Sequence, residues 1–218
     1  MRRNHNLDNI RRIWCQADDV DRTEGMTAFP RYRATLERLA NVYGVPLASA
    51  VGVFCALSPN NAYMTNLRAV KSMLSGGRGN GYTACRLRAK RCIAGENFLS
   101  FTKGLKTRNF YQNIMDPGNH YPVTIDGHAY CIWVGKRMTM KQAVRAKFDY
   151  HKIADGYREV AGELGIVPCQ LQAVTWFAWK RINKIVYNGQ MNMFWLGDQW
   201  RLDLEPHEIE DFVDKNKS

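Results

Sequence analysis

The stretch that most constrains the fold is LASAVGVFCAL, residues 47–57, which is apolar on nearly every face of a helix. A helix that is apolar all round is stable only when other apolar material surrounds it. This run contains Ser49 and Gly52 and is much shorter than the roughly 20 residues that a membrane-spanning helix needs. The sequence therefore predicts a buried helix at the centre of a globular fold, and no membrane association.

Most of the remaining sequence repeats its apolar residues at the spacing of an α-helix. Between Tyr32 and Tyr43 the apolar side chains recur every three or four residues, with charged residues between them. Alternation typical of a strand is confined to residues 123–125. We expect a loop containing Gly25 and Pro30 after the first helix. The pattern predicts an all-α protein with helices over residues 7–16, 32–43, 47–57, 61–74, 82–98, 107–115, 141–164 and 169–186.

The charge of the chain favours a polyanionic partner. Lysine and arginine outnumber aspartate and glutamate by 31 to 20 in 218 residues, a formal net charge of +11, which is typical of proteins that bind nucleic acid. Residues 76–108 hold eight basic side chains against one acid, although a solvated basic face is an alternative interpretation. Residues 198–218 hold seven acids against three basic side chains. We therefore expect one helical domain over residues 1–197 and an acidic tail over residues 198–218.

The cysteines and histidines do not have the spacing of a disulfide framework or a zinc site. No Cys-x-x-Cys pair occurs among the six cysteines, and His120 and His128 are not spaced as zinc ligands with them. No apolar signal segment follows the charged start of the chain. We therefore expect reduced thiols, no metal, no cofactor, and a monomer in the cytoplasm, or in the host cytoplasm if the chain is viral.

VTIDGHAY, residues 123–130, contains an aspartate that two different roles would explain. An aspartate directly after a short extended run is a common N-cap of a helix. A carboxylate held in place can instead take part in catalysis, because it can stabilise positive charge or activate a water molecule. The two roles are compatible, because a capping side chain can also face a substrate. Asp126 is therefore a candidate catalytic residue as well as a candidate cap.

Three stretches, taken in order, resemble the helix-hairpin-helix DNA glycosylases, the superfamily of endonuclease III. CALSPNNAYMTNLRAV, residues 55–70, is similar to their buried helix that ends at Leu-Ser before an amide side chain. GLKTRNFYQNI, residues 104–114, looks like a degenerate version of their hairpin. VTIDGHAY resembles the Val-Asp-Thr-His that carries their catalytic aspartate. The ALSPN and TIDGHA signatures also resemble a group of bacteriophage proteins, which indicates a divergent phage branch.

This resemblance implies two helical lobes with a cleft between them and catalysis at the mouth of that cleft. Asp126 matches the family aspartate that stabilises an oxocarbenium-like sugar. Lys106 matches the hairpin lysine that attacks the sugar carbon in members with lyase activity, although a phosphate contact is an alternative. His128 matches a histidine that orients the start of the aspartate's helix. We therefore expect the side chains of Lys106 and Asp126 to converge.

The resemblance also implies a set of DNA contacts. Asn60 matches the amide that fills the space left by an extruded base, although it could instead cap the next helix. Backbone amides of the hairpin and of the helix that follows it would bind phosphate. The expected nucleic-acid contacts are Asn60, Asn61, Lys103, Gly104, Thr107, Arg108, Arg86 and Lys90.

These residues lead to one expected function and two alternatives. The expected function is that of an enzyme which binds double-stranded DNA and removes a nucleobase, a DNA glycosylase with or without cleavage of the abasic sugar. A phage enzyme that modifies DNA bases on the same scaffold is one alternative. A DNA-binding protein that has kept the scaffold and lost the chemistry is the other. The presence of Asp126 and Lys106 favours an enzyme, whereas the degenerate hairpin favours a binding protein.

Overall fold

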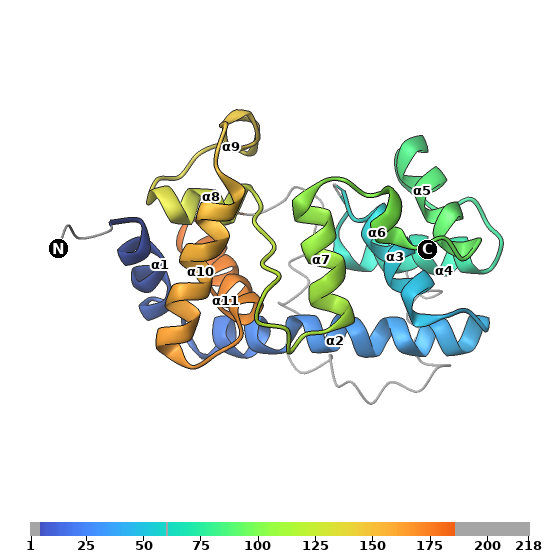
Figure 1. The fold of residues 1–218 in the computed structure, drawn as a ribbon, viewed down its shortest axis with the longest axis horizontal. Helices are drawn as coiled ribbons and strands as arrows, with labels where there is room; N and C mark the ends of the chain where they lie inside the picture. Colours follow the sequence, from blue (N-terminus) through green and yellow to red (C-terminus); the bar gives the residue numbers. More distant parts are fainter. Residues whose placement is uncertain (1–4, 60, 186–218) are drawn as a thin grey trace. The chain divides into compact units, whose positions relative to one another are not determined.

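The computed structural model describes residues 5–59 and 61–185 of the chain. The elements formed by these residues are all helices, with no strand among them, so the predicted all-α class is confirmed (Figure 1). Asn60 and the predicted acidic tail lie outside the described residues. The helices are α1 His5–Cys15, α2 Asp19–Tyr43, α3 Leu47–Leu57, α4 Tyr63–Leu74, α5 Thr83–Ile93, α6 Phe98–Phe101, α7 Leu105–Met115, α8 Gly127–Val134, α9 Met140–Arg145, α10 Tyr150–Leu164 and α11 Pro168–Ile182.

The described chain forms two compact units. Unit 1 contains residues 5–34 and 99–185, and unit 2 contains residues 35–59 and 61–98. Helix α2 begins in unit 1 and ends in unit 2. Unit 1 therefore contains α1 and α6 to α11 almost entirely, while α3, α4 and α5 belong to unit 2.

Unit 1 packs α1, α8, α10 and α11 around one core (Figure 1). Burying one large aliphatic side chain contributes roughly 1.5–3 kcal/mol to folding, and each of these helices supplies at least one. The Trp133 side chain, on α8, packs against Gly156, on α10, where an added Cβ would lie 2.3 Å from its ring. The large, fully buried aliphatic side chains of this core are Ile10, Ile13, Ile125, Ile132, Ile153 and Leu171.

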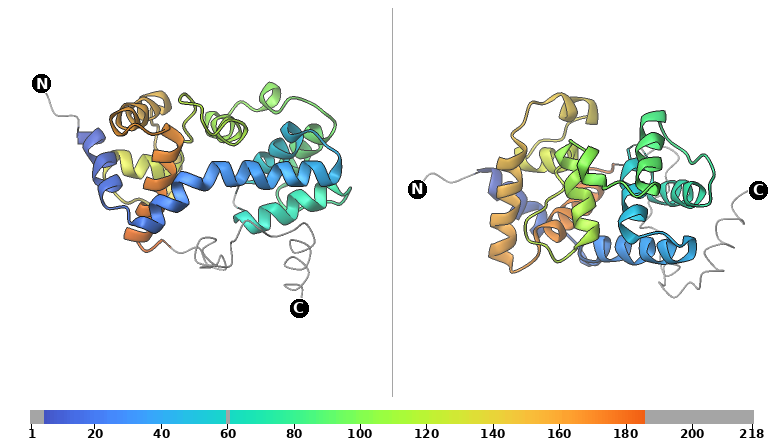
Figure 2. Two further views of the ribbon diagram at one scale, coloured as in Figure 1. Left: turned by 90° about the horizontal axis from the view of Figure 1, so that it is seen from below. Right: turned by 45° about the vertical axis from the view of Figure 1, so that its right-hand side comes forward.

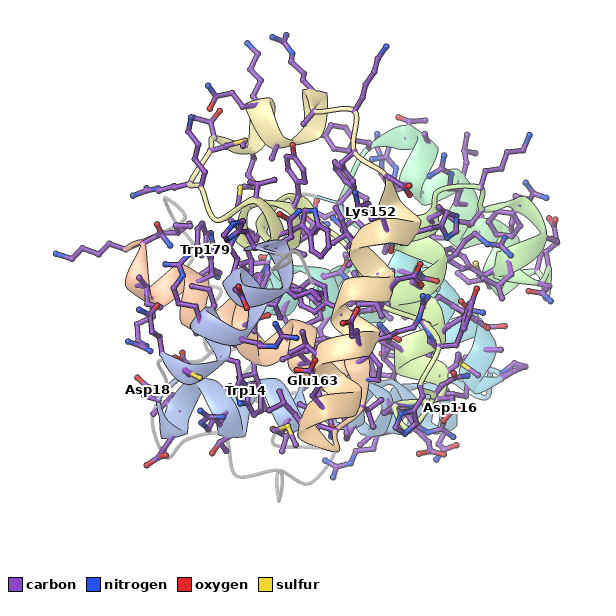
Figure 3. The ribbon with its side chains drawn as sticks, turned by 60° about the vertical axis from the view of Figure 1, so that its left-hand side comes forward. Trp14, Asp18, Asp116, Lys152, Glu163 and Trp179 are labelled. Atoms are coloured by element: carbon purple, nitrogen blue, oxygen red, sulfur yellow. The ribbon has the colours of Figure 1, made fainter. Side chains whose placement is uncertain are left out.

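A group of ion pairs, here called the Arg181 clamp, fixes the end of α11 against the turn between α1 and α2. The Arg181 guanidinium donates to Asp21 Oδ2 from Nε at 2.8 Å and from Nη2 at 2.6 Å. Its Nη2 also donates to the Gln16 carbonyl at 2.7 Å. Asp18, which is labelled in Figure 3, pairs with Nε at 2.9 Å. Asp21 is only 4% exposed, so loss of Arg181 would leave a buried charge uncompensated.

The predicted loop at Gly25 and Pro30 is wrong, because both residues lie inside α2, which is one continuous helix (Figure 2). An added Cβ at Gly25 would lie 2.4 Å from the Val174 backbone, so the glycine lets α2 and α11 cross closely. Proline has no N–H to donate to the carbonyl four residues earlier. Gln170 Nε2 donates to that carbonyl, on Met26, at 3.4 Å. Contacts with α11 therefore keep α2 helical where its local sequence predicts a break.

Unit 2 is built around α3, which confirms the predicted buried helix. Every residue of α3 from Ser49 to Leu57 is buried, and α4 and α5 pack against it. Gly52 allows the close approach of α5, since an added Cβ would lie 2.7 Å from Cys92 Sγ. In the described ranges no single helix is long and apolar enough to cross a membrane; α2 and α3 meet those criteria only together, as a pair bent by 116°.

Two of the predicted helices are each divided in the structure. The helix predicted over residues 82–98 ends at Ile93, shortly before Gly95 takes a left-handed φ of 86°, and the chain becomes helical again in α6. The helix predicted over residues 141–164 is divided into α9 and α10, and Asp149 caps α10 by accepting from the Lys152 amide at 3.1 Å. The apolar pattern continues across both breaks, so periodicity alone did not reveal them.

Candidate functional site

The extended stretch that leads to Asp126 is held by side chains in place of a neighbouring strand. Tyr150 Oη donates to the Val123 carbonyl at 2.7 Å and accepts from the Ile125 amide at 3.0 Å. Asn113 Nδ2, on α7, donates to Thr124 Oγ1 at 3.0 Å. The alternation over residues 123–125 is typical of a strand, but no strand forms there, and side chains of α7 and α10 hydrogen-bond to this stretch instead.

Asp126 is the N-cap of α8, and both of its carboxylate oxygens accept a hydrogen bond. Oδ1 accepts from the Ala129 amide at 2.8 Å, which confirms the predicted cap. Oδ2 accepts from the indole Nε1 of Trp176, on α11, at 3.1 Å. The carboxylate is half-buried and fixed by one donor from its own helix and one from a helix far away in the sequence.

Lys180 lies one helical turn after Trp176 and shares its surroundings. Its Nζ lies over the indole ring, 4.0 Å from the ring centroid, in a cation–π contact. Burial lowers the pKa of Lys180 to about 8, and the attraction of the Asp126 carboxylate partly opposes that shift. The side chain is half-buried, so this amine is far closer to neutrality at physiological pH than an ordinary lysine.

His128 is buried beside the same indole. Its ring meets Trp176 edge-on, with centroids 6.0 Å apart. Burial lowers the pKa of His128; the Asp126 charge raises it, and the charges of Lys180 and Lys106 lower it further. The imidazole is therefore neutral near pH 7. The hydrogen bonds that orient Asp126 come from Ala129 and Trp176, so an orienting role for His128 stays a prediction.

Lys106 is the second residue of α7, and its side chain is exposed. It lies within electrostatic range of His128, two residues after Asp126, so the structure brings the predicted lysine to the same part of unit 1. The charges of Lys106, on α7, and of Lys180, on α11, both lower the pKa of His128. Of the two amines, Lys180 is the one withdrawn from water.

The segment predicted as a degenerate hairpin has an ordinary helix start. Gly104 is the N-cap of α7 with φ −68°, and an added Cβ would meet nothing within 4 Å, so neither backbone nor packing requires a glycine there. Arg108 Nη1 donates to the carbonyls of Leu99 and Thr102 at 2.6 and 2.8 Å, which ties α7 to α6. Lys103 is exposed and Thr107 is half-buried.

The remaining predicted DNA contacts lie in unit 2. Asn61 Nδ2 donates to the Leu57 carbonyl at 2.7 Å and so caps the end of α3. Arg86 donates to the Gly81 carbonyl and to Thr83 Oγ1, and Lys90 is exposed on α5. These residues belong to a different unit from Asp126, and their contact with DNA stays a prediction.

Trp176 and Lys180 are the two site residues that sequence reasoning missed. Trp176 was interpreted as a core aromatic together with Trp179; the structure buries Trp179 in the core of unit 1 but leaves Trp176 half-buried at Asp126. Trp176 and Lys180 are four residues apart on one helix, a spacing that is visible in the sequence and predicts a shared face. The sequence did not reveal that this face meets Asp126, 50 residues earlier in the chain.

The arrangement provides a fixed carboxylate, a desolvated amine and a neutral imidazole in one place. A fixed carboxylate can stabilise a developing cation or position a water molecule for attack. A desolvated amine can attack a carbonyl carbon. Among the described residues no group of three or more histidine, cysteine, aspartate or glutamate side chains could hold a metal ion. The carboxylate, the amine and the imidazole themselves can supply acid–base and amine chemistry.

Comparison with known proteins adds one finding. No curated protein and no solved structure gives a significant match to the chain. A family model matches residues 1–183, a range that includes α1 to α11 and every residue of the site around Asp126. The chain therefore belongs to the family of unknown function DUF7178.

Proposed function

We propose that this protein binds double-stranded DNA and removes a nucleobase from it, as a DNA glycosylase with Asp126 as the catalytic carboxylate. The observation that carries the proposal is the double fixation of Asp126, by the Ala129 amide at 2.8 Å and the Trp176 indole at 3.1 Å. A carboxylate held in advance stabilises transition-state charge without having to reorganise.

The reaction breaks the bond between C1′ of the sugar and the base nitrogen. The base leaves with the electron pair of that bond and takes up a proton, and the sugar becomes oxocarbenium-like. The Asp126 carboxylate stabilises that positive charge and accepts a proton from the water that adds to C1′. The neutral His128 adds no positive charge beside the developing cation.

The charge of the chain supports DNA as the substrate. The formal net charge is +11, and exposed lysines occur at Lys103 and Lys106 in unit 1 and at Lys90 in unit 2. Lysine contacts with phosphate release counterions and supply affinity that does not depend on base sequence. Discrimination between bases then depends on the pocket that receives the extruded base.

The first test of the proposal measures base release. Free bases released from host and phage genomic DNA are identified by mass spectrometry, and the release rate is then measured on a duplex that contains the base found. Asp126→Asn retains a capping side chain but lacks the charge, so the rate falls by roughly a hundredfold or more. Asp149→Asn, at the N-cap of α10, is the matched control and retains the wild-type rate.

The alternative of a DNA-binding protein without catalysis rests on the segment before α7. Gly104 has an ordinary backbone conformation and Arg108 is engaged with internal carbonyls, so this segment lacks the glycine-dependent turn that the resemblance implies. If no base is released from any genomic DNA and Asp126→Asn binds duplex DNA as tightly as wild type, the protein is a DNA-binding protein and the proposed glycosylase function is wrong.

A further inference from the structure

The site contains an amine whose position is determined by the same indole that holds the carboxylate. Trp176 donates to Asp126 Oδ2 at 3.1 Å through its ring nitrogen, and the face of its ring carries Lys180 Nζ at 4.0 Å from the centroid. One rigid side chain thus sets both the carboxylate and the amine. Such an arrangement fixes two reacting groups relative to each other before a substrate binds.

We propose that Lys180, rather than Lys106, is the amine of this site that reacts covalently with an aldehyde carbon, C1′ of the ring-opened sugar at an abasic position in DNA. The inference rests on the proposed function, because removal of a base creates that aldehyde. Lys106 is exposed on α7, whereas Lys180 is half-buried against Trp176, and a nucleophilic amine depends on being withdrawn from water.

The protonation of Lys180 supports this role. With its pKa lowered to about 8, about a tenth of the amine is neutral at pH 7, far more than of an ordinary lysine. The charged and titratable groups around it are Asp126, which raises its pKa, and the neutral His128, whose own pKa is lowered by the charges of Lys180 and Lys106. Reaction of this amine therefore accelerates as the pH rises and levels off above about pH 8.

The covalent steps follow from amine and carbonyl chemistry. The Lys180 nitrogen attacks C1′ with its lone pair, a C–N bond forms, and the carbonyl oxygen takes up a proton. Loss of water from this carbinolamine leaves an imine. A base then removes a proton from C2′, the C3′–O bond breaks, and the phosphate leaves with the electron pair of that bond. Water hydrolyses the imine and returns the free amine.

The test uses a duplex with one abasic site, made by removing uracil, and sodium borohydride, which reduces an imine to a stable secondary amine. Wild-type protein forms a covalent adduct, and peptide mass spectrometry places it on Lys180. Lys180→Gln and Lys180→Arg both lose the adduct, because arginine keeps the positive charge but is not a nucleophile. In Lys106→Gln, peptide mass spectrometry still places the adduct on Lys180. The control Lys152→Gln, which removes an exposed lysine from the start of α10, retains the wild-type adduct (Figure 3).

The outcomes separate this inference from the proposed function. An adduct on Lys106, or an adduct that persists in Lys180→Arg, overturns the inference. Absence of any adduct with wild-type protein also overturns it, while base release that depends on Asp126 still supports a glycosylase without lyase activity. Because the adduct is mapped on the wild-type protein, the result does not depend on the folding of any variant. An adduct on Lys180 without base release supports Lys180 as the nucleophilic amine and contradicts the proposed glycosylase function.

Discussion

Trp176 is the side chain on which the site depends most at the scale of single residues. It donates to Asp126, carries Lys180 on its ring face and meets His128 edge-on. The aspartate was found from sequence because capping and catalysis both favour that residue type after a short extended run. The sequence did not identify Trp176 as a site residue, because its role depends on the contact between residues 126 and 176, which no local pattern encodes.

Substitution of Trp176 by phenylalanine tests this dependence. Phenylalanine keeps an aromatic ring but cannot donate to Asp126, and a hydrogen bond to a charged group contributes about 1.5–3 kcal/mol. We expect base release to slow by roughly ten- to a hundredfold in kcat, with KM little changed. Single-turnover kinetics on the duplex that serves for Asp126→Asn measure this effect.

Trp14→Phe is the matched control for this substitution. Trp14, on α1, also carries a cation over its ring, with Arg22 Cζ at 4.4 Å from the centroid. It has no part in the contacts of Asp126, so the variant retains the wild-type rate. Equal rates for Trp176→Phe and wild type would show that the indole hydrogen bond does not contribute to catalysis.

Helix α2 shows where sequence reasoning succeeds and fails at the scale of elements. The continuous apolar run over residues 47–57 predicted α3, whereas the helical period predicted α10 only as part of a longer helix over residues 141–164. Gly25 and Pro30 misled the prediction, because both residues usually break helices and the contacts that overcome this preference come from α11. Elements whose boundaries depend on tertiary contacts could not be predicted from local sequence.

Gly25→Ala tests the close crossing of α2 and α11. The added Cβ would lie 2.4 Å from Val174, so the helices must separate, and we expect the free energy of unfolding to fall by about 1–3 kcal/mol. Gly162→Ala is the control, since Gly162 lies inside α10 with nothing within 4 Å of an added Cβ. Alanine should stabilise that helix by roughly 0.5–1 kcal/mol. Urea denaturation measures both changes, and equal stability of the two variants would contradict the crossing.

At the scale of the whole molecule, the basic side chains predicted to contact DNA are divided between the two units. Lys103 lies in unit 1 and Lys90 in unit 2, and both are exposed. The net charge predicted a polyanionic partner without revealing this division, because charge counts carry no information about packing. Each unit therefore presents its own candidate phosphate contacts.

The salt dependence of DNA binding tests whether both units bind. We expect the plot of log K against log salt to become shallower by about 0.9 for each phosphate contact removed, in Lys103→Gln and in Lys90→Gln alike. Lys152→Gln leaves the slope unchanged, because Lys152 lines a surface pocket together with Asp149, Asp155 and Glu159, where DNA phosphate would be repelled. Fluorescence anisotropy between low and moderate salt measures the slopes, and an unchanged slope in Lys90→Gln would exclude unit 2 from the contact.

The Arg181 clamp has a consequence for how α11 can vary. Trp176, Lys180 and Arg181 lie within about one and a half turns of α11. Each successive residue is rotated by about 100° around the helix axis, which sets the direction in which its side chain points. One inserted or deleted residue between the indole and the guanidinium would point one of them away from its carboxylate partner. The Arg181 clamp therefore fixes the rotation of α11 about its own axis. Insertions and deletions in α11 are tolerable only outside residues 176–181.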